Sequence, residues 1–103
     1  MTQRQMDLKN DREYLEHCIR SCESYIRGYE ELIASAERQI EEERQVRGKG
    51  AAIAKDRIAY LTKSFIPYQK EGIEDAQESL KRYKSRLENL SFIENDGQLE
   101  FIF

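Results

Sequence analysis

Two cysteines one helical turn apart, Cys18 and Cys22, are the residues of this chain with the clearest chemical potential. On a helix they would share one face, and Glu13 and His17 lie close by, so a thiolate metal site has to be considered. His17, however, would project about 100° away from Cys18 on a helix, and residues 45–103 contain no His or Cys to complete a tetrahedral site. We therefore expect both cysteines to be small core residues, and we predict no metal and no cofactor.

Residues suited to catalysis are equally scarce. His17 is the only histidine, and it would lie on the polar side of a helix, where no positioned nucleophile is predicted. Glu13, Glu16 and His17 do not have the Glu-x-x-His spacing of a di-iron helical bundle. The sequence GKG at residues 48–50 lacks both the preceding strand and the spacing of a phosphate-binding loop. The sequence thus predicts no enzyme and no catalytic residue.

The densest basic run, KRYKSR at residues 81–86, suggests a nucleic-acid site in which basic side chains bind phosphates and Tyr83 stacks on a base. Tyr83, however, falls on an apolar stripe, and acidic residues surround the run at helix-pairing distances. The net charge of −3 also argues against a general affinity for phosphate backbones. A solvated helix face is the simpler interpretation. The nucleic-acid alternative depends on Lys81, Arg82, Lys84 and Arg86.

A long helix over about residues 3–47 would carry the first group of these side chains. The segment has no Pro, its only Gly is Gly28, and Thr2 with Gln5 has the spacing of a capping box. Apolar residues recur every seven positions in three adjacent columns, which is typical of a helix that meets more than one neighbour. The first column is Leu8, Leu15, Cys22, Tyr29 and Ala36, the second is Cys18, Tyr25, Leu32 and Val46, and the third is Ile19, Ile26, Ile33 and Ile40.

A turn at residues 48–50 and a second apolar pattern follow this helix. Gly48 and Gly50 supply the backbone freedom that a reversal requires. The later pattern changes phase near Pro67, whose ring disrupts a helix interior, so we expect helices at about 51–65 and 67–93. Because the two arms are nearly equal in length, the predicted fold is all-α: an antiparallel, coiled-coil-like hairpin whose second arm is kinked near Pro67.

The pairing of the two arms predicts close packing at a glycine. Folding at residue 49 pairs positions whose numbers sum to about 98, which places Ile40 near Ile58. It also places Tyr25 and Ile26 opposite Gly72, so that a bulky side chain meets a missing one. Because Gly is roughly 1 kcal/mol worse than Ala inside a helix, this close approach gives a reason for Gly72.

Two helices leave the third apolar column uncovered. Burial of an isoleucine side chain is worth roughly 1.5 to 3 kcal/mol, so an exposed column would be costly and would favour association. We predict a two-fold homodimer that forms a four-helix bundle, with coverage by a different protein as the alternative. The predicted dimer interface is Ile19, Ile26, Ile33 and Ile40.

The kink is one candidate site for another protein, and the C-terminus is a second. Aromatic residues flank the kink, and aromatic anchors dominate many interfaces. After the stop signal NDG at residues 95–97, alternating apolar residues predict a short extended tail at 96–103. The tail could pack on the open end of the hairpin, pair with its twin in a dimer or add a strand to a partner's sheet. The predicted partner-binding residues are Tyr60, Phe65, Ile66, Tyr68, Leu99, Phe101 and Phe103.

Composition limits the functional class. With 36% charged and 39% apolar residues over 103 positions, the chain resembles long helices and coiled coils and is expected to form a single helical domain. No apolar run could span a bilayer, and no signal sequence is evident, so we expect a cytoplasmic protein without membrane contact. The predicted function is a non-enzymatic interaction module, namely a small viral or bacterial regulator or inhibitor that binds another protein. A self-assembling scaffold or chaperone is the alternative, and a nucleic-acid-binding accessory protein is the third.

Overall fold

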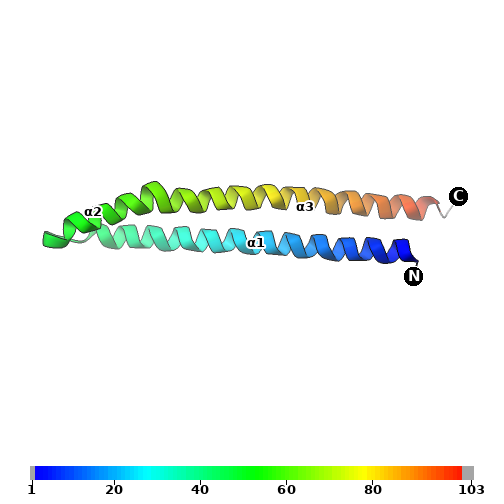
Figure 1. Cartoon of the computed structure of the whole chain (residues 1–103), viewed down its shortest axis with the longest axis horizontal. Coiled ribbons are helices and arrows are strands. Elements are labelled where there is room, and N and C mark those ends of the chain that lie inside the picture. Colours follow the sequence, from blue (N-terminus) through cyan, green and yellow to red (C-terminus); the bar gives the residue numbers. More distant parts are fainter. Residues whose placement is uncertain (1, 101–103) are drawn as a thin grey trace. The chain divides into compact units, whose positions relative to one another are not determined.

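The computed structural model describes the backbone of residues 2–100 and the side chains of residues 2–94. The described residues form three α-helices, α1 (Gln3–Arg44), α2 (Ala51–Tyr60) and α3 (Ile66–Glu100). A 3-10 turn at Gly48–Gly50 precedes α2, and a π-helical turn at Leu61–Phe65 joins α2 to α3. Helix α1 and the second arm run in opposite directions (Figure 1), which confirms the predicted all-α antiparallel hairpin.

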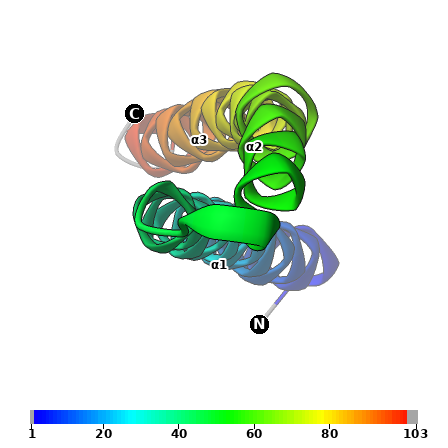
Figure 2. The ribbon, with the colours of Figure 1, turned by 90° about the vertical axis from the view of Figure 1, so that its left-hand side faces the viewer.

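The chain packs as two compact units, each built from antiparallel helical segments. The turn unit is Tyr25–Ala76, and the terminal unit comprises Met1–Ser24 and Gln77–Phe103. Helices α1 and α3 contribute a segment to both units. In the turn unit, α2 lies beside the last turns of α1, as seen from the end where the chain reverses (Figure 2).

Helix α1 begins at the predicted capping box. The backbone N–H of Thr2 donates to Gln5 Oε1 at 2.8 Å, and the backbone N–H of Gln5 donates to Thr2 Oγ1 at 3.2 Å. Two backbone donors that have no partner within the helix are thereby satisfied.

The helix ends at Arg44, three residues before the predicted end at residue 47. The N–H groups of Gln45 and Val46 bond to carbonyls three residues back, which tightens the last turn. The guanidinium of Arg47 then donates to the Arg44 carbonyl oxygen at 2.7 Å. Gly48 reverses the chain with φ of 76°, a conformation that side-chain-bearing residues rarely adopt.

The second arm is interrupted just before Pro67, in agreement with the predicted phase change. The interruption is the π-helical turn at Leu61–Phe65, and Pro67, whose ring has no N–H to donate within a helix, stands directly after it as the second residue of α3. The structure corrects the predicted extended tail at residues 96–103, because α3 continues through Glu100. Once a helix is formed, each further residue adds a hydrogen bond at small cost, which outweighs the local stop signal. Residues 101–103 lie outside the described residues.

The buried side of α1 differs from the predicted one by a single column. The first column is buried as expected, with exposures of 4% at Leu15 and 3% at Ala36. Its partner is the isoleucine column: Ile40 is buried, and Ile19, Ile26 and Ile33 are half-buried. The second column is largely outside, with Tyr25 65% exposed. Both columns fit a seven-residue repeat, but Gln39 interrupts the second, whereas β-branched isoleucines fill the third from Ile19 to Ile40.

Buried and half-buried positions of the second arm also follow a heptad, with one extra residue. They recur with spacings of four and three at Ala54, Ile58, Leu61 and Phe65, and a second spacing of four then leads to Gln69. The regular alternation resumes from Ile73, Ala76, Leu80 and Tyr83 to Leu87, Leu90 and Glu94. A π-helical turn accommodates one inserted residue, so the turn at Leu61–Phe65 keeps both halves of the arm facing α1.

Candidate interaction surfaces

The core of the turn unit absorbs several residues that the sequence assigned to interfaces. Ala36, Ile40 and Leu61 form a buried cluster against which Ile58, Phe65 and Ile66 pack. Ile40 is only 7% exposed, so it has little surface left for a dimer interface. Phe65 and Ile66 are half-buried on this cluster and therefore contribute mainly to the fold.

Gly72 provides the closest packing between the two arms of the turn unit. A Cβ atom at residue 72 would lie 2.7 Å from Cζ and 2.9 Å from Cε1 of Tyr29. The predicted contact between a large residue and Gly72 is therefore present, but its partner is Tyr29 instead of Tyr25 and Ile26. The paired numbers sum to 101 here, and to 100 where Arg57 donates to Glu43 Oε1 at 3.0 Å. The early end of α1 and the extra residue in the π-helical turn account for the shift from 98.

The extra residue also aligns three exposed apolar side chains on the second arm. Ile53, Tyr60 and Tyr68 are 58%, 60% and 69% exposed. In a continuous α-helix, residues eight positions apart differ by about 80° in direction, whereas residues seven apart nearly coincide. We call the buried and half-buried positions at which the two arms meet the seam. Because one residue is absorbed between Tyr60 and Tyr68, each of these tyrosines lies directly before a seam residue, and both share one side of the arm.

From Tyr25 to Gln39 on α1 and from Tyr60 to Gly72 on the second arm, one side of the turn unit carries no charged residue, and we call it the uncharged flank. It consists of the row of positions that borders the seam on the side of the Tyr29–Gly72 contact and of the row next to it; Glu42, Arg57 and Asp75 lie in the same rows beyond these limits. The flank residues are Tyr25, Gly28, Leu32, Ser35 and Gln39 on α1, and Tyr60, Ser64, Tyr68 and Gly72 on the second arm.

The opposite border of the seam carries charge of both signs. Its positions include Glu30 and Glu37 on α1, and Lys55 and Lys70 on the second arm. In an antiparallel helix pair, equivalent border positions of the two helices lie on the same side, so each border is a continuous feature of the turn unit. The two borders therefore differ in chemistry.

In the terminal unit, the end of the seam nearest the chain termini is formed by an ion pair instead of an apolar contact. Arg12 continues the isoleucine column, and its Nη2 donates to Glu94 Oε2 at 2.6 Å and to Ser91 Oγ at 3.2 Å. The hydrogen bond with Glu94 raises the pKa of Arg12 above its ordinary value. Both side chains are about one-third exposed, so the pair contributes little to stability but fixes which residues face each other.

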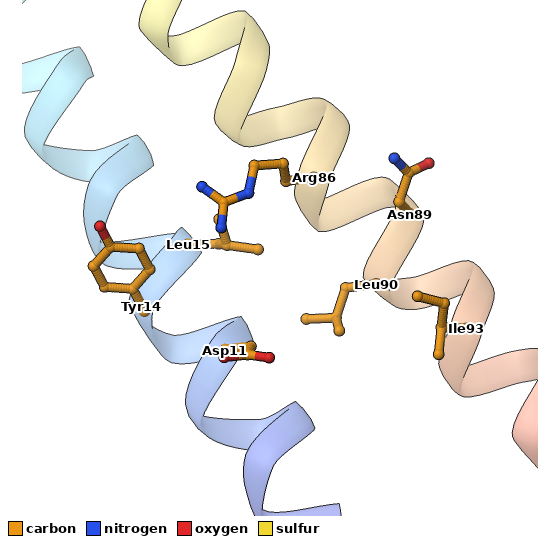
Figure 3. A pocket seen from close by; sticks show the side chains of 7 residues that line it. All are labelled: Asp11, Tyr14, Leu15, Arg86, Asn89, Leu90 and Ile93. Atoms are coloured by element: carbon orange, nitrogen blue, oxygen red, sulfur yellow. The ribbon is translucent and has the colours of Figure 1, made fainter. Parts of the chain in front are cut away.

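A small open hollow lies on the surface of the terminal unit. It has a volume of about 240 Å³, and the buried Leu15 and Leu90 lie among its lining residues. Asp11 and Tyr14 line it from α1, and Arg86 extends toward it from α3 (Figure 3). Asn89 and Ile93 complete the lining. Its mixed polar and apolar lining, open to solvent, does not indicate a particular ligand.

Tyr14 at this hollow has a perturbed phenol. The pKa of Tyr14 lies above its ordinary value of 10.0, chiefly because of a hydrogen-bonding interaction with the Cys18 side chain and the charge of that group. Tyr83 and burial act in the same direction, whereas the Arg86 guanidinium lowers the pKa. Since the fold favours the neutral phenol, the stability that it contributes is complete below about pH 10 and is lost as the pH rises through the folded pKa.

Substitutions around Tyr14 should shift this titration in opposite directions. We expect the difference in absorbance at 295 nm between the wild type and Tyr14→Phe to reveal a tyrosine that ionises above pH 10. Cys18→Ala should lower the midpoint of this difference curve, and Arg86→Gln should raise it. Equal midpoints in all three backgrounds would contradict the assigned neighbours.

The remaining predicted site residues fall outside these surfaces. Leu99 lies within α3, but its side chain is not among those described, and Phe101 and Phe103 lie outside the described residues. Cys22 is buried and Cys18 is half-buried, in line with a packing role. Lys81, Arg82, Lys84 and Arg86 are exposed, but Tyr83 is half-buried on the seam and so has little freedom to stack on a base.

Comparisons of the chain with protein-family models, with curated proteins and with solved structures found no match. Among the described helices, none combines the length and the apolar character needed to cross a membrane. The geometry of the described surfaces is therefore the basis for a functional proposal.

Sequence reasoning missed the uncharged flank and the ion pair that closes the seam. The flank was within reach, because no Asp, Glu, Lys or Arg occurs at its positions between Tyr25 and Gln39. Because the column that contains Tyr25 was expected to be buried, its lack of charged residues was not interpreted as a surface feature. Nothing in the sequence singled out Glu94 as the partner of Arg12, since that pairing depends on the shifted alignment of the arms.

Proposed function

We propose that this chain is a non-enzymatic interaction protein that presents its uncharged flank to another polypeptide. The observation that supports this best is the distribution of large apolar side chains among the described residues. Ten are exposed, whereas the buried core has seven hydrophobic residues, three of which are alanine or cysteine, and no side chain is less than 2% exposed. Five of the ten, Tyr25, Leu32, Ile53, Tyr60 and Tyr68, lie on or beside the uncharged flank.

A two-layer helix pair has too little interior to bury all of its apolar side chains. Burial of apolar surface is worth about 25 cal/mol per Å², and aggregation threatens a protein that leaves a large apolar patch open. Tyrosines are well suited to interfaces, because they supply a large contact area with only two rotatable side-chain bonds. Tyr60 and Tyr68 are exposed on helical turns of the scaffold and are the natural anchors.

The polypeptide bound at the flank is either another protein, for which the chain would be a small regulator or inhibitor, or a second copy of the chain, which would make it a self-assembling scaffold. The self-complementary pattern of the flank described below favours the second copy. In either role, the chain acts by binding a polypeptide and not by catalysing a reaction.

Site-specific photocrosslinking tests the proposal. Tyr60 and Tyr68 are each replaced by p-benzoylphenylalanine, and the chain is irradiated in the cells that express it. We expect both positions to yield crosslinked polypeptides. The matched control is Lys63, an exposed residue of the π-helical turn between Tyr60 and Tyr68 that is not a flank residue, and it should yield none. Equal labelling at Lys63, or no labelling at all, would contradict a binding role for the flank.

A further inference from the structure

We infer that the uncharged flank of the turn unit is a two-fold interface, and that its occupant is a second copy of this chain. This inference rests on the proposed function and names the partner of the same surface. It also moves the dimer interface from the isoleucine column, which faces the chain's own second arm, to the flank.

Large and small side chains alternate along the flank. On α1, Tyr25 and Leu32 alternate with Gly28 and Ser35. On the second arm, Tyr60 and Tyr68 alternate with Ser64 and Gly72. Each arm thus presents large side chains separated by small ones, and a two-fold interface needs a surface whose large residues fit its own small ones.

The two arms also place their large residues on different rows of the flank. The large residues of α1 occupy the row nearer the seam, and its small residues occupy the outer row. On the second arm this order is reversed, with Tyr60 and Tyr68 in the outer row and Ser64 and Gly72 in the inner one. A second copy related by two-fold symmetry can therefore set rows of large residues into rows of small ones, which is how helices of a four-helix bundle pack.

The absence of charged residues from the flank also favours a second copy as its occupant. The chain carries 20 acidic and 17 basic residues, yet none lies at a flank position from Tyr25 to Gln39 or from Tyr60 to Gly72. Two copies of a chain with net charge −3 repel each other, and an uncharged face allows them to approach without burying an unpaired charge. A different protein would be expected to select its partner through complementary charges, and this face offers none.

Absolute mass by light scattering, measured over a wide range of concentrations, tests the inference with the full chain in reducing buffer. We expect the wild type to have twice the chain mass of 12.2 kDa. Ser64→Glu places a charge on the flank and should weaken the dimer roughly tenfold or more. Thr62→Glu is the matched control, because Thr62 is an exposed hydroxyl residue of the same π-helical turn on the charged border, and the dimer should persist.

Leu32→Glu provides a second flank variant on the other arm, and circular dichroism verifies that each variant keeps its helices. Leu32 is 46% exposed, so the fold of a single chain should tolerate the change. A wild-type monomer at all concentrations overturns the inference but leaves the proposed function intact, with the flank open to a different protein. A dimer that resists both flank variants overturns the inference and also removes the flank as the binding surface. A larger assembly overturns the two-fold contact.

Discussion

Gly72→Ala should destabilise the protein, although the same change in most exposed helix interiors is stabilising. The new Cβ would lie 2.7 to 3.0 Å from three atoms of the Tyr29 ring, so the ring must leave its place on α3. Overpacking of this kind typically costs about 1 to 3 kcal/mol, and the gain in helix propensity returns at most about 1 kcal/mol. We expect a lower free energy of unfolding in urea, with a net loss of about 1 to 2 kcal/mol.

Gly28→Ala is the matched control and should change stability in the opposite direction. Gly28 also lies within a helix, but a Cβ there would meet no atom within 4 Å. At a chain concentration low enough for the monomer to dominate, so that the flank is open, the unfolding free energy should therefore rise by up to about 1 kcal/mol. In a Tyr29→Leu background the clash at residue 72 is relieved, so Gly72→Ala should become neutral or stabilising. If Gly72→Ala lowered stability equally with and without the Tyr29 ring, close packing would not be the reason for this glycine.

The sequence specifies the local features of this fold better than the alignment of its two arms. The extent of α1 to within three residues, the capping box at Thr2 and the reversal at Gly48 follow from local rules and were predictable, whereas the continuation of α3 through Glu100 was not. The closeness of an aromatic residue to Gly72 was also predictable, because a glycine inside a helix needs a reason. Which aromatic residue it would be was not, since that depends on the alignment of two arms over many residues.

The flank was missed for a related reason, namely the wrong choice of the second buried column on α1. Columns three and four residues from Leu15 fit the heptad equally well, and helix geometry alone does not choose between them. Packing against the second arm makes the choice, because it buries the isoleucines and leaves Tyr25 and Leu32 outside. The assignment of Ile19, Ile26, Ile33 and Ile40 to a dimer interface followed from the other choice. Only the helix pair as a whole distinguishes the covered column from the open one.

Deletion of one serine should have opposite consequences in two parts of the second arm. Removal of Ser64 takes the extra residue out of the π-helical turn, so that an uninterrupted heptad runs from Ala54 to Glu94. Ile66 then takes the seam position of Phe65, Phe65 moves to the position of Ser64, and the apolar residues from Ile73 onward still face α1. A regular α-helical turn also replaces a less favourable one. We expect thermal unfolding, followed by circular dichroism, to remain cooperative, with stability within about 1 kcal/mol of the wild type.

Deletion of Ser85 removes another exposed serine, this one from a regular stretch of α3. All later residues then rotate by about 100°, which turns Leu87 and Leu90 away from the seam. The burial of each leucine is worth roughly 1.5 to 3 kcal/mol, and Glu94 also loses its position beside Arg12, so a loss of several kcal/mol is expected. Because the two deletions shorten the chain equally, only the phase of the heptad separates them. Equal losses would mean that the π-helical turn has a role other than absorbing one residue, and the alignment of Tyr60 with Tyr68 would then need a different explanation.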